Sequence, residues 1–166
     1  FNLDPTIVLF GFGDVGKNKF TPALKHYLKL CSNKTFPLIN QNEELNYLIV
    51  DIDENKRKEA DIFQKECENE KIPIKVMFFN FNLEKDRKKF FAILENNKVN
   101  LTYIASPNRT HATYIDLLLD KSDIILVEKP LVDYKHEIEA VISRHGLDKL
   151  AKVRLIDHYL FKDCLL

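Results

Sequence analysis

The hexapeptide Gly11-Phe12-Gly13-Asp14-Val15-Gly16 predicts more about this chain than any other part of its sequence. It follows an apolar run at 6–10, which predicts a buried strand, and it precedes a segment at 17–30 that predicts a helix. A strand, a GxGxxG loop and a helix in this order are typical of a dinucleotide site. The chain has only four glycines, and three lie here, which an ordinary tight turn does not require.

Each glycine of the loop has a distinct physical role in such a site. Gly11 permits the tight turn, Gly13 lets the backbone approach a pyrophosphate, and Gly16 lets the helix pack closely on the strand. The helix N-terminus offers N–H groups and a partial positive charge to the phosphates. The predicted cofactor contacts of this loop are Gly11, Phe12, Gly13, Asp14, Val15 and Gly16.

Composition limits the classes of protein that the chain can represent. Its 166 residues suggest one domain, and 25 basic residues balance 25 acidic ones, which gives no hint of a nucleic-acid or membrane partner. No apolar run approaches the roughly 20 residues of a membrane span. Cys31, Cys67 and Cys164 are an odd number without metal-like spacing, so we expect free thiols, no metal site and a cytoplasmic location.

Strands and helices alternate along the whole sequence. The predicted strands cover residues 6–10, 45–50, 74–81, 101–105, 124–127 and 152–156, and the predicted helices cover 17–30, 54–70, 84–97, 110–121 and 134–145, with Gly146 as a C-cap. This alternation predicts an α/β fold with a doubly wound parallel sheet of about six strands, a Rossmann fold covered on both faces.

Asp51 ends the second predicted strand and is the second expected element of the cofactor site. A carboxylate there can accept hydrogen bonds from the adenosine ribose, which favours NAD over NADP. The acid usually stands about 20 residues after the glycines, and the long polar stretch at 31–44 explains its greater distance here. A turn residue is the alternative. Lys17, Lys56 or Arg57 can still recruit a 2′-phosphate, so NADP stays open.

Three more polar stretches follow strands four, five and six, at the edge of the sheet where ligands bind. In the first, at 106–111, Asn108 and Thr110 can cap the next helix, whereas His111 has no such structural reason, although a lone histidine is more often structural than catalytic. We expect cofactor contacts from Ser106, Pro107, Asn108 and His111.

The second stretch, Glu128-Lys129-Pro130, places a carboxylate and an ammonium at this edge, beside a proline that can be cis. A surface lysine is the alternative. The third, at 157–162, combines Asp157, His158 and Lys162, and the last two share a face if the segment is helical. That pair suits an anionic or polyhydroxy substrate, but an ordinary solvated face would look the same.

Together these motifs resemble the Gfo/Idh/MocA oxidoreductases and their relatives, the glucose-6-phosphate dehydrogenases. The shared motifs are Glu128-Lys129-Pro130 and, upstream of it, Pro107-Asn108-Arg109-Thr110-His111. Gly13 to Leu24 and Ile156 to Lys162 are similar to stretches of glucose-6-phosphate dehydrogenase. Phe161 replaces a glycine of that enzyme, and Asp51 replaces a basic residue of its NADP-preferring members, so the pattern fits Gfo/Idh/MocA better.

The resemblance implies roles for individual residues. Lys129 would contact the substrate near its reacting carbon, and Glu128 would contact the cofactor. His158 and Lys162 would hold a substrate phosphate, and Tyr159 is also expected to bind the substrate. Asp157 would orient a catalytic histidine supplied from farther along. The predicted catalytic residues are thus Lys129, Asp157 and His158.

Members of the family continue into an open-faced β-sheet domain with the catalytic base and the oligomer interface. Because the sequence stops at Leu166, we expect residues 1–166 to be the dinucleotide-binding domain. Residues 157–166 would then begin the connection to an absent substrate domain, through which the protein would form a homo-oligomer. The first hypothesis is an NAD(P)-dependent oxidoreductase acting on a CH–OH group of a sugar, sugar phosphate or cyclitol. The alternative is a non-catalytic dinucleotide-binding sensor or scaffold.

Overall fold

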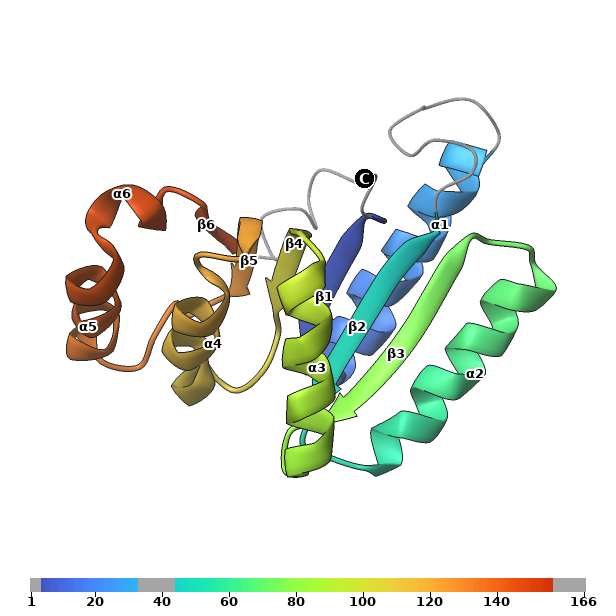
Figure 1. Cartoon of the computed structure of the whole chain (residues 1–166), viewed down its shortest axis with the longest axis horizontal. Coiled ribbons are helices and arrows are strands. Elements are labelled where there is room, and N and C mark those ends of the chain that lie inside the picture. Colours follow the sequence, from blue (N-terminus) through green and yellow to red (C-terminus); the bar gives the residue numbers. More distant parts are fainter. Residues whose placement is uncertain (1–3, 33–43, 157–166) are drawn as a thin grey trace, which may run out of the picture.

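The computed structural model of the chain describes residues 4–32 and 44–156. These residues form a six-stranded parallel sheet in the order β3-β2-β1-β4-β5-β6 (Figure 1). The strands are β1 (Thr6–Phe10), β2 (Leu45–Asp51), β3 (Ile74–Asn80), β4 (Val99–Ile104), β5 (Ser122–Glu128) and β6 (Val153–Ile156). This order is that of the doubly wound dinucleotide-binding fold, so the predicted fold class is confirmed.

Helices cover both faces of the sheet. On one face α1 (Thr21–Ser32) and α2 (Asn55–Asn69) pack against the strands, and on the other α3 (Glu84–Asn96), α4 (His111–Leu118) and α5 (Lys135–His145) do so (Figure 1). Successive residues of a strand point to opposite faces. Val8 and Phe10 of β1 therefore enter one core layer while Leu9 enters the other, and all three are fully buried. An apolar run without alternation is the expected sequence of such a central strand.

The sheet reverses its winding between β1 and β4. Because β2 and β4 lie on opposite sides of β1, the loops that follow β1 and β4 lead away in opposite directions. The crevice between such loops, outside the carboxyl ends of the strands, is where open α/β sheets bind ligands. The fold therefore brings the predicted glycine loop and the loop at 105–110 to one crevice.

The first helix is less regular than predicted. A π-helical turn, η1 (Gly16–Phe20), precedes α1, and the Thr21 N–H and hydroxyl both donate to the Gly16 carbonyl, the hydroxyl at 2.7 Å. Pro22 follows at once and has no N–H for a regular helical bond. The wider turn just before it is a common way for a helix to accommodate an irregularity of this kind.

The ends of β4 and β5 also differ from the prediction. Both strands begin two residues earlier than predicted, at Val99 and Ser122, which pair with each other in the sheet, and the Ser122 hydroxyl lies 2.7 Å from the buried Thr102 hydroxyl. Polar residues within a strand hide its start from a hydrophobic pattern. Gly146 ends α5 with a φ of +84°, as predicted, and the short α6 (Leu147–Leu150) after it was not foreseen.

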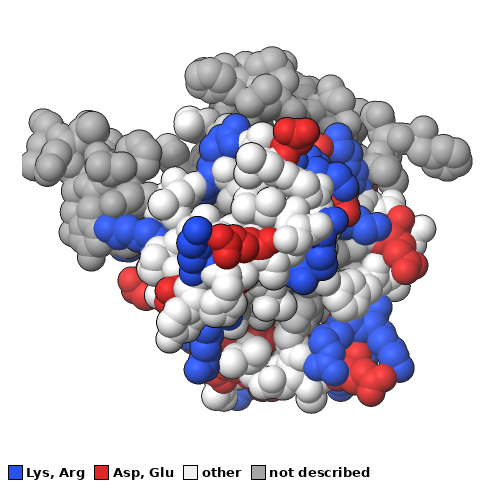
Figure 2. Space-filling model, turned by 90° about the vertical axis from the view of Figure 1, so that its left-hand side faces the viewer, with Lys and Arg blue, Asp and Glu red and all other residues white. Residues whose placement is uncertain are grey.

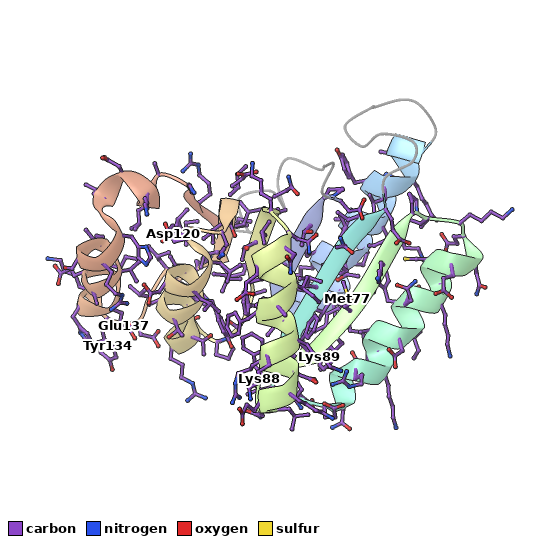
Figure 3. The ribbon with its side chains drawn as sticks, in the orientation of Figure 1. Met77, Lys88, Lys89, Asp120, Tyr134 and Glu137 are labelled. Atoms are coloured by element: carbon purple, nitrogen blue, oxygen red, sulfur yellow. The ribbon has the colours of Figure 1, made fainter. Side chains whose placement is uncertain are left out.

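The surface near α5 carries charges of both signs. Figure 3 labels Tyr134 and Glu137 at the start of α5, where the Glu137 carboxylate accepts the Tyr134 N–H at 2.9 Å. Figure 2 shows basic and acidic side chains interspersed over this end of the molecule, and Arg144 pairs with Asp116 at 2.9 Å. Within 4–32 and 44–156, no helix has the length and apolarity needed to cross a membrane.

Candidate functional site

The three loop glycines occupy unlike surroundings. Gly11 has a φ of +92°, and a Cβ there would lie 2.6 Å from the Ala105 carbonyl oxygen of the neighbouring strand end. A Cβ on Gly16 would lie 2.2 Å from the Gly11 oxygen. By contrast, a Cβ on Gly13 would have no atom within 4 Å. Gly11 and Gly16 thus allow close packing, and Gly13 leaves open space over the backbone, as a loop that receives a pyrophosphate requires.

Asp51 ties the end of β2 to this loop. Its Oδ2 accepts the Phe12 N–H at 2.7 Å, and its Oδ1 accepts the N–H groups of Ile52 at 2.7 Å and Asp53 at 3.0 Å. The carboxylate therefore shapes its own turn and also fixes the glycine loop. A carboxylate has about four acceptor positions, so three such bonds leave capacity for a ribose hydroxyl.

A small pocket of about 70 Å³ opens beside Asp51, between the ends of β1, β2 and β4. Its lining consists of Gly11, Val50, Asp51, Ile52, Ser106, Pro107, Arg109, Thr110 and Tyr114. The Tyr114 ring stacks on Phe10 with centroids 4.0 Å apart, and burial, followed by the charge of Asp51, raises the pKa of its hydroxyl. Sequence reasoning missed Tyr114, although its place three residues after His111, about one helical turn, was a usable signal.

The loop after β4 is held by its own hydroxyls. The Thr110 hydroxyl donates to the Pro107 carbonyl at 2.7 Å and lies 2.7 Å from the Ser106 hydroxyl. Thr110 occupies the N-cap position of α4 without a side-chain cap bond, and Asn108 begins a short 3₁₀ turn, η2 (Asn108–Thr110). Thr110 therefore takes the N-cap position as predicted, but its side chain makes no cap bond, because the hydroxyl is used within the loop.

His111 joins the loop after β4 to the loop after β5. Its ring is fully buried, with Nε2 2.8 Å from the Ser106 carbonyl oxygen and Nδ1 3.0 Å from the Pro130 carbonyl oxygen. Both nitrogens thus face backbone oxygens, and the side chain positions two loops of the crevice relative to each other. Direct contact of His111 with a cofactor stays a prediction.

The Glu128-Lys129-Pro130 stretch ends β5 with one buried and one exposed charged residue. Glu128 is buried and accepts a hydrogen bond from the Tyr103 hydroxyl, while Lys129 is exposed and precedes a cis Lys129–Pro130 peptide bond. Burial first, and then the bond to Glu128, raise the pKa of Tyr103. Tyr103 was not predicted. It pairs with Leu126 in the sheet, and this register puts it on the same face as Glu128.

The cations expected near a 2′-phosphate are all paired with carboxylates. The Lys17 and Lys56 ammonium groups lie 2.9 and 3.2 Å from the Glu59 carboxylate. Arg57 pairs with Glu54 and lies 2.7 Å from Asp86, beside β3. The predicted catalytic residue Asp157 and the predicted substrate-binding residues His158, Tyr159 and Lys162 lie outside the described residues.

Several solved structures share this fold. A 3-ketoreductase from Actinomadura kijaniata, solved with NADP and TDP-benzene, is 18% identical with a TM-score of 0.55 over 95% of this chain and 38% of that one. A myo-inositol dehydrogenase from Corynebacterium glutamicum is 21% identical with a TM-score of 0.52 over 92% and 36%. The WlbA dehydrogenase from Bordetella pertussis, solved with NADH and UDP-GlcNAcA, is 14% identical with a TM-score of 0.52 over 92% and 36%.

At these identities the likeness shows the fold alone, and the chain spans little more than a third of the length of those proteins. No curated protein matches the chain in sequence. A family profile described as an oxidoreductase family with an NAD-binding Rossmann fold, Gfo/Idh/MocA, matches residues 6–145. The glycine loop, the sheet order and this match agree, and the chain therefore belongs to the Gfo/Idh/MocA oxidoreductase family.

Proposed function

We propose that this chain is the cofactor-binding part of a dehydrogenase or reductase that passes hydride between nicotinamide and a CH–OH carbon of a sugar, sugar phosphate or cyclitol. The claim that the chain binds a dinucleotide rests on the open space over Gly13 and on the Asp51 carboxylate that is bonded to the same loop. The substrate half is supported by the Glu128-Lys129-Pro130 motif and by fold neighbours described as a 3-ketoreductase and a myo-inositol dehydrogenase.

Different residues would bind the cofactor and the substrate. Backbone N–H groups around Gly13 would hold the pyrophosphate, and Asp51 would accept a ribose hydroxyl, which favours NAD over NADP. Ser106, Pro107 and Asn108 would complete the cofactor side, held in place by His111. The bound nicotinamide supplies the redox chemistry. Lys129 would hold a substrate oxygen with its ammonium, close to the buried Glu128.

The rest of the substrate site is proposed to come from farther along the chain. Asp157 would orient a catalytic histidine, and His158, Tyr159 and Lys162 would bind the substrate. In this proposal residues 157–166 lead into a substrate domain that supplies the general base and the contacts of a homo-oligomer. We further propose that the protein works in the cytoplasm, in line with the buried free thiol of Cys67.

A sensor or scaffold that binds a dinucleotide without catalysis is the second candidate. The surroundings of His111 favour this candidate. This histidine lies in the described part of the crevice, but carbonyl oxygens face both of its ring nitrogens, so neither nitrogen is turned toward a substrate. A general base must reach the substrate proton, and this ring is fully buried.

The test compares this chain with a version extended past Leu166. Steady-state hydride transfer would be measured with sugars, sugar phosphates and inositols, alongside NADH titration. We expect both proteins to bind NADH and only the extended one to turn over. Turnover by the 166-residue chain would place the base within it, and an extended protein that binds NADH but reduces or oxidises none of the panel would favour the sensor.

A further inference from the structure

Two lysines, one after the glycine loop and one after the turn that follows β2, share a single carboxylate. Glu59, on the second turn of α2, lies 2.9 Å from the Lys17 ammonium and 3.2 Å from that of Lys56. All three side chains are only partly exposed, at 29% for Glu59, 43% for Lys17 and 26% for Lys56. Partial burial reduces solvent screening, so such contacts are stronger than fully exposed ion pairs.

The position of this cluster connects it to the cofactor. Lys17 directly follows the glycine loop, and Lys56 lies in the first turn of α2, which starts at the sheet edge where β2 ends (Figure 1). Phe12 links the two places, because its N–H bonds the Asp51 carboxylate and its side chain lines a groove of about 290 Å³ together with Lys17 and Glu59. The Lys56 N–H donates to the Asp53 carbonyl oxygen at 3.1 Å, so the cluster adjoins the turn that follows Asp51, where the ribose is proposed to lie.

NADP differs from NAD by a phosphate on the ribose 2′-oxygen, and cations near the end of β2 attract that group. Here the two lysines donate to Glu59 instead. The hydrogen bond from Lys17, assisted by the ion pair with Lys56, lowers the pKa of Glu59, so the carboxylate is charged at neutral pH.

We propose that Glu59 is a specificity-determining residue that favours NAD by withholding Lys17 and Lys56 from a 2′-phosphate. This inference rests on the proposed function, because it needs the adenosine ribose at Asp51. It adds a second discriminator to Asp51. Asp51 would repel the phosphate directly, whereas Glu59 would act through the two lysines and need not touch the cofactor.

The test is titration of NADH and NADPH, followed by fluorescence, into the wild-type chain and the Glu59→Gln variant. We expect the affinity for NADPH relative to NADH to rise about fivefold, the effect of the stronger ion pairs measured near protein surfaces. The gain should disappear near 1 M salt, where charges are screened within about 3 Å. Adding Lys17→Met to Glu59→Gln should remove part of the gain, which a purely structural role of Glu59 would not predict.

Glu66→Gln is the matched control. Glu66 lies two turns later on α2 and pairs with Lys25 at 3.2 Å, but Lys25 keeps Glu70 at 2.8 Å. The control removes the same charge without releasing a lysine, so its NADPH-to-NADH ratio should equal that of the wild type. An unchanged ratio in a Glu59→Gln protein that still binds NADH would overturn the inference, as would an equal shift in Glu66→Gln. If the wild type binds neither nucleotide, the proposed function itself fails.

Discussion

The loop after β1 and the loop after β5 lie at the same edge of the sheet, on either side of β4, yet they serve the proposed site in opposite ways. At the glycine loop, the absence of side chains allows a φ of +92° at Gly11 and open space over Gly13. At the loop after β5, side chains supply the chemistry, with Glu128 buried against Tyr103 and Lys129 exposed. A site formed by backbone groups thus depends on local steric freedom. A site formed by side chains depends on which residues the other strands and domains place next to it.

The largest effect should follow a side chain at Gly16. In Gly16→Val the Cβ would meet the Gly11 carbonyl oxygen 2.2 Å away, and the helix would have to move off the strand. Overpacking of this kind costs about 3 kcal/mol of unfolding free energy. Urea unfolding should show the loss, and Gly13→Val, the same substitution in open space, is the control. A Gly16→Val protein as stable as the wild type would contradict the packing role.

Removal of the Lys129 ammonium tests the other loop. In the protein extended past Leu166, Lys129→Ala should lower turnover about 100-fold, the usual cost of losing a positioned charge in a closed site. NADH affinity should change little, because the lysine is proposed to face the substrate. Lys121→Ala, an exposed lysine at the start of β5, is the control for charge. Full activity in Lys129→Ala would remove the residue from the mechanism.

Asp51→Ser tests a side chain that acts beside the backbone site of the glycine loop. It removes a charged acceptor for the ribose and a charge that faces a 2′-phosphate, so the NADPH-to-NADH affinity ratio should rise about 30-fold. Asp53→Ser, two residues on in the exposed turn, should leave the ratio unchanged. If both variants keep the wild-type ratio in fluorescence titrations, Asp51 shapes the turn and the glycine loop but does not select the cofactor.

The smallest effect should come from Tyr103→Phe, which removes the hydroxyl that donates to Glu128. We expect a loss of about 1 kcal/mol in unfolding free energy, since a buried acceptor loses one partner. Urea unfolding of Tyr103→Phe, of Glu128→Ala and of the double variant would give the coupling between the two side chains. Additive losses would show that the bond contributes nothing.

The same contrast explains what could be predicted from the sequence. The alternation of strands and helices, the glycine turn at Gly11 and the glycine end of α5 follow from local rules of periodicity and backbone geometry, and the structure contains all three. The partner of Glu128, the buried bridge through His111 and the pairing of Lys17 with Glu59 depend on strand register and on helices far apart in sequence. Local pattern carries no information about such distances, so these contacts became visible only in three dimensions.

NADH titration of the wild-type chain and of Gly13→Val tests the dinucleotide site most directly. Gly13 has no positive φ, and a side chain there meets no protein atom within 4 Å, so the variant should unfold at the same urea concentration as the wild type. The valine would occupy the space of the pyrophosphate. We expect saturable NADH fluorescence enhancement in the wild type and none in Gly13→Val. A folded Gly13→Val protein with wild-type NADH affinity would contradict the assignment of this loop.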